Sequence, residues 1–123
     1  MKIGVLGTGW IVMTVTPALK GIPEAECYAI ASRTKERAEA AAKEYGYEKA
    51  YGSYEELVAD DEMDLVYIAT PHSHHFQHAM LALEHGRNVL VEKAFTANAQ
   101  EAEILIRTAH EKGLFITEAI WTR

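Results

Sequence analysis

The sequence predicts an α/β fold: a Rossmann-type doubly wound parallel sheet of about six strands with helices on both faces. Short runs of apolar and β-branched residues recur along the chain, and helical stretches separate them. The runs are nearly continuous rather than alternating, as strands covered on both faces require. The joints between runs and helical stretches are short, which is typical of repeated β-α units.

The predicted strands differ in strength. The run "DLVYIAT" is long and apolar, whereas "KAYG" is short and contains a lysine, so we expect the strand that it forms to lie at an edge of the sheet. The predicted strands span residues 2–6, 27–32, 49–52, 64–70, 88–92 and 114–119.

The helical stretches carry start and stop signals. Thr34 is placed to cap one helix and Gly46 to end it, while Ser53 and Glu56 have the spacing of a capping box at the start of the next. Pro17 falls where a helix after the first strand should have its interior, so we expect a kink or a delayed start there. The predicted helices span residues 34–46, 53–61, 73–86 and 98–113.

Length and composition bound the class of protein. The chain has 123 residues, of which 49% are hydrophobic and 24% charged, which is ordinary for one globular domain and excludes disordered and fibrous classes. The formal net charge of −6 argues against nucleic acid as the main partner. The apolar runs fall far short of the roughly 20 residues that a membrane helix needs. A single cysteine, Cys27, and the absence of a signal-peptide pattern lead us to expect a cytoplasmic protein.

A glycine-rich turn follows the first strand. Gly7 and Gly9 have the spacing of a dinucleotide-binding fingerprint, in which the first allows a tight turn and the second lets the backbone approach a pyrophosphate. The third position of that fingerprint, usually Gly or Ala, is Val12. The motif is weak alone, and its place at the first strand-to-helix turn strengthens it. We expect a dinucleotide to contact Gly7, Thr8, Gly9, Trp10 and Ile11.

The end of the second strand favours NADP over NAD. A carboxylate would accept from both ribose hydroxyls of NAD, and none stands there; Ser32 and Arg33 do, followed by Lys35 and Arg37. Ser32, Arg33 and Arg37 are therefore predicted to bind a 2′-phosphate. The alternative is an ordinary solvated helix start. Basic residues there oppose the helix dipole, which favours an anion-binding role.

Four histidines stand close together in "TPHSHHFQH". His74 and His78 are four residues apart on a predicted helix, a spacing that can hold zinc, but no cysteine or carboxylate completes a ligand set in this segment. Unremarkable histidines at a helix start or on the surface are the simpler alternative. We predict no metal site.

A third interpretation of the same segment rests on its position. It follows the fourth strand, which in this topology flanks the crevice where ligands bind. Thr70, Pro71 and His72 would then line the coenzyme, and His75 would face it one turn later.

Two charges, Glu92 and Lys93, stand at the end of the apolar run "NVLV" without a turn residue between. A surface ion pair at a strand end is the structural explanation, and such pairs contribute little stability.

The glycine turn, "ASR", "ATPHSHH" and "VEKAFTANA", in this order and spacing, resemble the amino-terminal half of the Gfo/Idh/MocA family of NAD(P)-dependent oxidoreductases. "YGSYEELVAD" and "TEAIWTR" are most similar to its dihydrodiol dehydrogenase and xylose dehydrogenase branch. The resemblance covers essentially the whole chain. It implies a hydride transfer between NADP, or alternatively NAD, and a hydroxyl or carbonyl of a sugar or diol.

The resemblance also implies residue roles. The family's Glu-Lys-Pro motif lies beside the nicotinamide and maps onto Glu92, Lys93 and Ala94, which makes Lys93 the catalytic residue and Glu92 a coenzyme contact or a support for the lysine. The Lys93 ammonium could then hydrogen-bond a substrate hydroxyl and stabilise the alkoxide-like oxygen as hydride leaves the carbon. Ala94 replaces the proline, so the backbone after Lys93 is less constrained. Trp121 and Arg123 resemble a segment that lines the cleft between two domains.

The resemblance bears on domain organisation too. We expect residues 1–123 to form the dinucleotide-binding domain, with the family's substrate domain absent, so that the chain alone turns over little or not at all. A non-catalytic nucleotide-sensing or vestigial module, with Val12 and Ala94 as signs of decay, is the competing hypothesis. A face left uncovered by a missing domain would favour self-association, so we expect a homo-oligomer.

Overall fold

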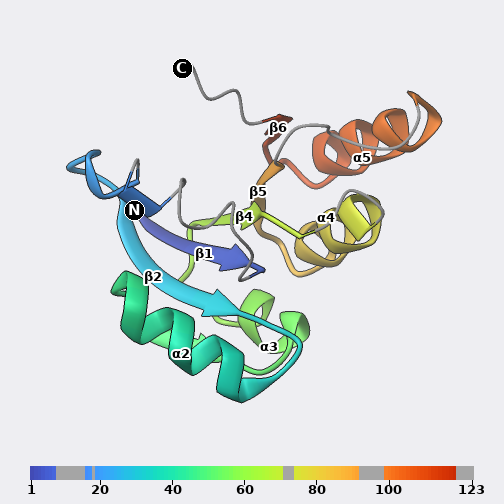
Figure 1. Cartoon of the computed structure of the whole chain (residues 1–123). Coiled ribbons are helices and arrows are strands. Elements are labelled where there is room, and N and C mark those ends of the chain that lie inside the picture. Colours follow the sequence, from blue (N-terminus) through green and yellow to red (C-terminus); the bar gives the residue numbers. More distant parts are fainter. Residues whose placement is uncertain (8–15, 18, 71–73, 92–98, 119–123) are drawn as a thin grey trace.

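A computed structural model of the chain describes residues 1–7, 16–17, 19–70, 74–91 and 99–118 (Figure 1). These residues form a six-stranded sheet in the order β3-β2-β1-β4-β5-β6, in which every neighbouring pair is parallel. The predicted doubly wound parallel sheet is confirmed. The strands are β1 Lys2–Leu6, β2 Glu26–Ala31, β3 Lys49–Tyr51, β4 Leu65–Ile68, β5 Asn88–Val91 and β6 Ile116–Glu118.

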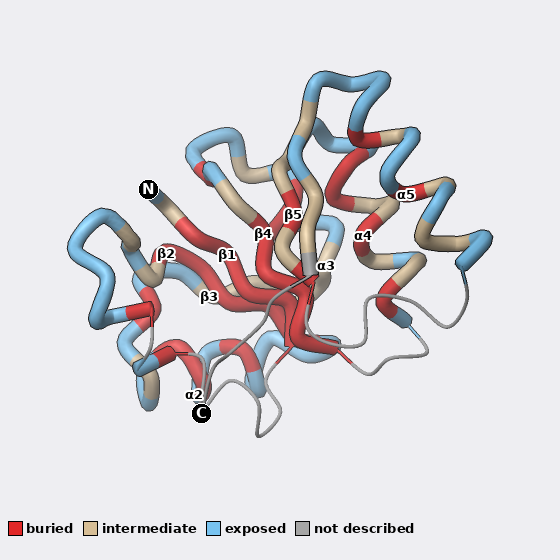
Figure 2. Tube along the Cα trace, turned by 90° about the horizontal axis from the view of Figure 1, so that it is seen from above, coloured by how far each residue is buried: buried red, intermediate tan, exposed pale blue. Residues whose placement is uncertain are grey.

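The helices cover both faces of the sheet. Ala41 and Ala42 of α2 pack with Ile3 and Val5 of β1 on one face. The other face holds the second core cluster, to which α3, α4 and α5 contribute residues such as Leu57, Leu83 and Leu105. Figure 2 shows the buried residues concentrated in the central strands and the exposed residues on the outer sides of the helices. The helices are α2 Lys35–Tyr45, α3 Tyr54–Val58, α4 His75–Glu84 and α5 Ala99–Glu111.

The capping signals in the sequence act as predicted in α2 and α3. The Thr34 side chain accepts a hydrogen bond from the Arg37 backbone N–H at 3.3 Å, and Gly46 ends α2 with a φ of 81°. The Ser53 side chain accepts from the Glu56 N–H at 3.2 Å. These two caps fix where α2 and α3 begin, at the same edge of the sheet.

Several boundaries differ from the prediction. The helix predicted over residues 53–61 ends at Val58, because Asp60 leaves the helix and its carboxylate binds two tyrosines. The fourth strand ends at Ile68 rather than at residue 70. The cap of α4 is His74, which makes no side-chain cap hydrogen bond, whereas the predicted start at residue 73 lies outside the described residues.

The connection from β1 to β2 is described only in part. Thr16, Pro17, Leu19 and Lys20 have helical backbone, and residues 8–15 and 18 lie outside the described part. The kink or delayed start expected around Pro17 therefore stays a prediction. The third strand does lie at an edge of the sheet, as predicted. No helix in the described ranges is both long and apolar enough to cross a membrane.

Candidate functional site

The candidate site is the carboxyl edge of the sheet, where β1, β2 and β4 end side by side. The Gly7 N–H donates to the Ala31 carbonyl at 2.9 Å, and the Ala69 N–H donates to the Leu6 carbonyl at 2.9 Å. These bonds tie the first residues after the three strands to one another. In parallel sheets with this strand order, ligands bind outside the carboxyl ends, where the strand order reverses. Here the chain goes from β1 outward to β2 and β3, and returns to β4 on the other side of β1.

Gly7 makes the turn at the end of β1 possible. Its φ is 114°, which is unfavourable for any residue with a side chain. A Cβ at this position would also lie 2.9 Å from the Ala69 carbonyl oxygen, so the chain after β4 passes too closely for a side chain. The predicted role of Gly7 in a tight turn is confirmed. Its contact with a dinucleotide stays a prediction.

The start of α2 carries two exposed arginines. Arg33 and Arg37 are exposed, and neither forms an ion pair with another residue in the described ranges. Two exposed guanidiniums on one turn suit an anion with several oxygens, such as a phosphate. The phosphate-binding role of this segment stays a prediction.

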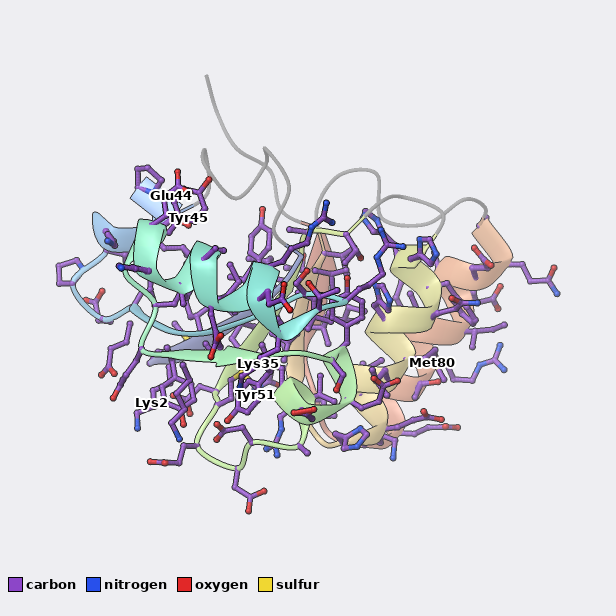
Figure 3. All side chains as sticks on the ribbon, turned by 60° about the horizontal axis from the view of Figure 1, so that its bottom comes forward. Lys2, Lys35, Glu44, Tyr45, Tyr51 and Met80 are labelled. Carbon is purple, nitrogen blue, oxygen red and sulfur yellow. The ribbon has the colours of Figure 1, made fainter. Side chains whose placement is uncertain are left out.

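Lys35 takes a different position from the arginines. Its ammonium donates to the Ala50 carbonyl at 2.9 Å and lies 6.0 Å from the centre of the Tyr51 ring. Figure 3 shows Lys35 and Tyr51 next to each other, so this lysine holds the start of α2 against the edge strand β3. Ser32 is 4% exposed, and its N–H donates to the Tyr51 carbonyl at 3.2 Å. Little of Ser32 is therefore accessible.

Two histidines of α4 hold the end of β4. His75 is completely buried, and its Nε2 atom lies 2.7 Å from the Thr70 carbonyl oxygen. The Nδ1 atom of His78 lies 2.7 Å from the hydroxyl of Thr70, which is itself 5% exposed. The predicted positions Thr70 and His75 are thus brought together at the edge of the sheet. The ring of His75 anchors the end of the strand and has no exposed surface.

The remaining histidine contacts form an aromatic cluster. The rings of His74 and His78 are stacked with centroids 5.6 Å apart, and Tyr54 meets His78 edge-on with centroids 4.5 Å apart. The pKa of His78 is lowered to about 4, mainly by burial and further by the nearby His74 and His75. The Glu55 carboxylate acts in the opposite direction. His78 is therefore neutral at physiological pH and its Nδ1 can accept from Thr70. Across the ranges that the structure describes, no group of three or more His, Cys, Asp or Glu could hold a metal ion.

Much of the predicted site lies outside the described residues. Its catalytic role and coenzyme contacts therefore remain predictions. The residues concerned are Thr8, Gly9, Trp10, Ile11, Pro71, His72, Glu92, Lys93, Trp121 and Arg123.

Sequence reasoning missed Tyr54 and the role of His78. Tyr54 is the first residue of α3 and belongs to no coenzyme-binding motif, yet it connects the α2 side of the edge to the histidines of α4. A signal was present, since a residue just after a parallel strand lies at the carboxyl edge. This signal is weak, because the strand before Tyr54, β3, is short and lies at the edge of the sheet.

Comparisons with known proteins agree with this geometry. The chain is 48% identical to D-xylose 1-dehydrogenase (NADP(+)) of Hypocrea jecorina, over all of this chain and 34% of the relative. It is 38% identical to trans-1,2-dihydrobenzene-1,2-diol dehydrogenase of Mus musculus, over all of this chain and 38% of the relative. The chain thus spans about a third of the length of these relatives.

Solved oxidoreductase structures are also similar to this chain. KijD10, a 3-ketoreductase from Actinomadura kijaniata crystallised with TDP-benzene and NADP, superposes with a TM-score of 0.91 at 34% identity, over 96% of this chain and 37% of that one. The model of the Gfo/Idh/MocA oxidoreductase family, described as an NAD-binding Rossmann fold, matches residues 1–119. The chain therefore belongs to the Gfo/Idh/MocA oxidoreductase family, of which it contains the NAD-binding Rossmann fold.

Proposed function

We propose that this chain is the NADP(H)-binding domain of an oxidoreductase that transfers hydride between the nicotinamide and a hydroxyl or carbonyl group of a sugar or diol. The relatives support the substrate class, because they are named as a D-xylose dehydrogenase and as dihydrodiol dehydrogenases. They support the coenzyme too, since the first is named for NADP and KijD10 was crystallised with it.

The observation that carries the proposal is the pair of exposed guanidiniums that follow β2, on Arg33 and in the first turn of α2 on Arg37. Arg33 and Arg37 are exposed and lack an ion-pair partner among the residues described, in a chain whose net charge is −6. Arg87 and Arg107, by contrast, each pair with a carboxylate. Exposed cations at the strand edge that also carries the glycine turn suit the 2′-phosphate of NADP.

The chain's own residues would bind and orient the reactants. Gly7 and the turn after it would hold the pyrophosphate, and Arg33 and Arg37 the adenosine end. When bound, the coenzyme supplies or accepts the hydride. Lys93, two residues beyond the end of β5, would donate a hydrogen bond to the substrate oxygen and stabilise negative charge there, with Glu92 holding the lysine.

We further propose that residues 1–123 act as the dinucleotide-binding domain and that a substrate domain supplies most sugar or diol contacts in the complete enzyme. The length of the relatives, of which this chain spans about a third, supports this division. A cytoplasmic location suits the single thiol, Cys27, which would stay reduced there. Exposed apolar side chains on α5 and before β6, at Ile106 and Phe115, support self-association of the chain, which light scattering across concentrations would measure.

Coenzyme titration tests the proposal. The fluorescence of NADPH should rise on binding to the chain, and Arg33→Ala should weaken NADPH by about tenfold or more while changing NADH little. Lys35→Met is the matched control, because Lys35 is a cation on the same turn whose ammonium binds the Ala50 carbonyl instead. It should leave the preference for NADPH unchanged. Absence of NADPH binding to the wild-type chain at physiological concentrations would rule out the proposed function, and equal effects of Arg33→Ala on both coenzymes would rule out NADP specificity through this residue.

A further inference from the structure

Tyr54 lies directly beside the start of α2. The strand before it, β3, pairs with β2 so that Tyr51 stands opposite Ala31, and the Ser32 N–H donates to the Tyr51 carbonyl at 3.2 Å. Between β3 and α3, Gly52 packs so tightly against α2 that a Cβ on it would lie 3.1 Å from the backbone nitrogen of Lys35. The residues that lead into α3 and those that begin α2 are therefore in contact.

The ring of Tyr54 is fixed from the opposite side by α4. It meets the His78 ring edge-on, with centroids 4.5 Å apart and planes at 63°, and the hydrogen bond to Thr70 holds the His78 ring in turn. Tyr54 thus lies between the segment that packs against the start of α2 and the histidine that contacts Thr70 after β4. A residue in this position borders the edge where the adenosine end of a dinucleotide lies in this fold.

The electrostatic surroundings of Tyr54 match those of an anion site. Burial, the larger effect, raises the pKa of the phenol, and the positive charges of Arg33 and Arg37 act in the opposite direction. The two guanidiniums therefore make the electrostatic potential at this hydroxyl more positive. Because the net shift is upward, the phenol stays protonated at neutral pH and can donate a hydrogen bond. The Tyr54 hydroxyl makes no hydrogen bond to any other residue in the described ranges.

We propose that Tyr54 is a specificity-determining residue of the coenzyme site, whose phenol O–H donates to the 2′-phosphate alongside the guanidiniums of Arg33 and Arg37. The inference rests on the proposed NADP function and extends it to a residue outside the β2 tip. A phosphate has three terminal oxygens, so two guanidiniums leave acceptor capacity for a neutral donor. An O–H···O⁻ bond to phosphate is roughly twice as strong as one to a neutral ribose hydroxyl, which is why this contact favours NADP over NAD.

Adenosine 2′,5′-bisphosphate and AMP isolate this contact, because they share the adenosine 5′-phosphate and differ in the 2′-phosphate. Binding of each to the 123-residue chain is measured by isothermal titration calorimetry. Tyr54→Phe should lower the affinity for the bisphosphate about tenfold and leave the affinity for AMP within about twofold of wild type. The substitution keeps the ring that contacts His78, and a thermal melt followed by circular dichroism checks that the fold is retained.

Tyr45→Phe is the matched control. Tyr45 is a partly buried tyrosine in the last turn of α2, far from Lys35 at the opposite end of the same helix (Figure 3). Its replacement should change neither affinity. A second measurement is a double-mutant cycle, in which Tyr54→Phe should cost less bisphosphate affinity on the Arg33→Ala background than in the wild type, since both groups would bind one phosphate.

The possible results separate the two proposals. A wild-type chain that binds bisphosphate no better than AMP overturns the NADP assignment and, with it, the role of Tyr54. A wild-type chain that prefers the bisphosphate, with the same preference in Tyr54→Phe, overturns the role of Tyr54 alone. Equal loss of both ligands in Tyr54→Phe also overturns it, because a purely structural tyrosine would act in that way.

Discussion

The Nδ1 atom of His78 lies 2.7 Å from the Oγ1 atom of Thr70, and this contact joins the first turn of α4 to the end of β4. Thr70 can donate only while Nδ1 is unprotonated, so the contact depends on a neutral histidine. The lowered pKa of His78, about 4 against an ordinary 6.5, satisfies that condition at physiological pH. The neutral histidine therefore links the stability of the site to pH.

The first prediction concerns stability in mild acid. Because the pKa of His78 is lower in the folded than in the unfolded chain, the unfolded state takes up a proton first as the pH falls. The contribution of neutral His78 to the free energy of unfolding is complete above about pH 6.5. It is lost as the pH falls from about 6.5 to 4, and it changes no further below that. In His78→Asn, the side-chain oxygen can still accept a hydrogen bond from Thr70. The free energy of unfolding of this variant should depend less steeply on pH in this range, by the slope that uptake of about one proton produces.

Urea unfolding at several pH values between about 7.5 and 4 measures this effect. His85→Asn, at the exposed end of the same helix, is the control and should keep the wild-type profile. If His78→Asn and the wild type lose stability in parallel over this range, His78 is not the group responsible.

A second prediction concerns Asp60, whose carboxylate ties together β2, β3 and the turn after α3. It accepts from the Tyr51 hydroxyl at 2.6 Å, from the Tyr28 hydroxyl at 2.8 Å and from the Glu62 N–H at 2.9 Å. Asp60→Asn replaces a charged acceptor by an amide that cannot serve all three donors, and should lower the free energy of unfolding by about 1–3 kcal/mol. Asp61→Asn, next in the chain with its side chain 99% exposed, should change it by less than about 0.5 kcal/mol.

The Asp60 carboxylate should also contribute to the loss of folding stability at low pH. Burial of Asp60 raises its pKa, but the bonds from Tyr51, the Glu62 backbone and Tyr28 outweigh it and hold the pKa below the ordinary 3.8. This contribution is present above about pH 3.8 and is lost as the pH falls through the lower folded pKa. Chemical denaturation of Asp60→Asn and Asp61→Asn measures both effects, and equal stabilities of the two variants would contradict this account.

The sequence predicted the framework of the site because that framework rests on local signals. Thr34, Ser53 and Gly46 act on neighbouring backbone groups, so their roles could be read without knowledge of the fold. The apolar runs predicted the parallel sheet, and the short third run predicted its edge.

Contacts between distant segments could not be predicted in this way. Tyr54 and His78 are 24 positions apart, and Tyr28 and Asp60 are 32 apart, so their contacts arise only when the strands align. The helix predicted through Asp60 failed for the same reason. Its local pattern continued, but hydrogen bonds to two tyrosines on other strands ended the helix earlier.

A third prediction compares two glycines that both have positive φ. Gly7 has a φ of 114° and would place a Cβ 2.9 Å from the Ala69 carbonyl oxygen, whereas Gly86 has a φ of 78° with nothing within 4 Å of such a Cβ. Gly86→Ala should therefore lower the free energy of unfolding only by the backbone strain of about 1–2 kcal/mol. Gly7→Ala should cost more, because the strain is joined by a clash with backbone that cannot move aside without separating β1 from β4.

Urea denaturation of both variants compares these costs. If Gly7→Ala is no less stable than Gly86→Ala, the close approach of Gly7 to Ala69 is not a constraint on the fold. NADPH titration of Gly7→Ala adds a functional measurement, because a shifted turn should also lower the affinity for the coenzyme.

The last prediction concerns Lys93 in the complete enzyme. An ammonium that only donates to the reacting oxygen should contribute to the chemical step and little to coenzyme binding, so Lys93→Met should lower kcat by about 10²–10⁴-fold. The Kd for NADPH should remain within about twofold of wild type. Lys112→Met, which removes an exposed cation just after α5, is the control and should leave both quantities unchanged. Stopped-flow hydride transfer with a polyol or aldose, together with NADPH titration, separates the two effects. A large loss of NADPH affinity in Lys93→Met with an unchanged rate of hydride transfer at saturation would make Lys93 a coenzyme-binding residue rather than a catalytic one.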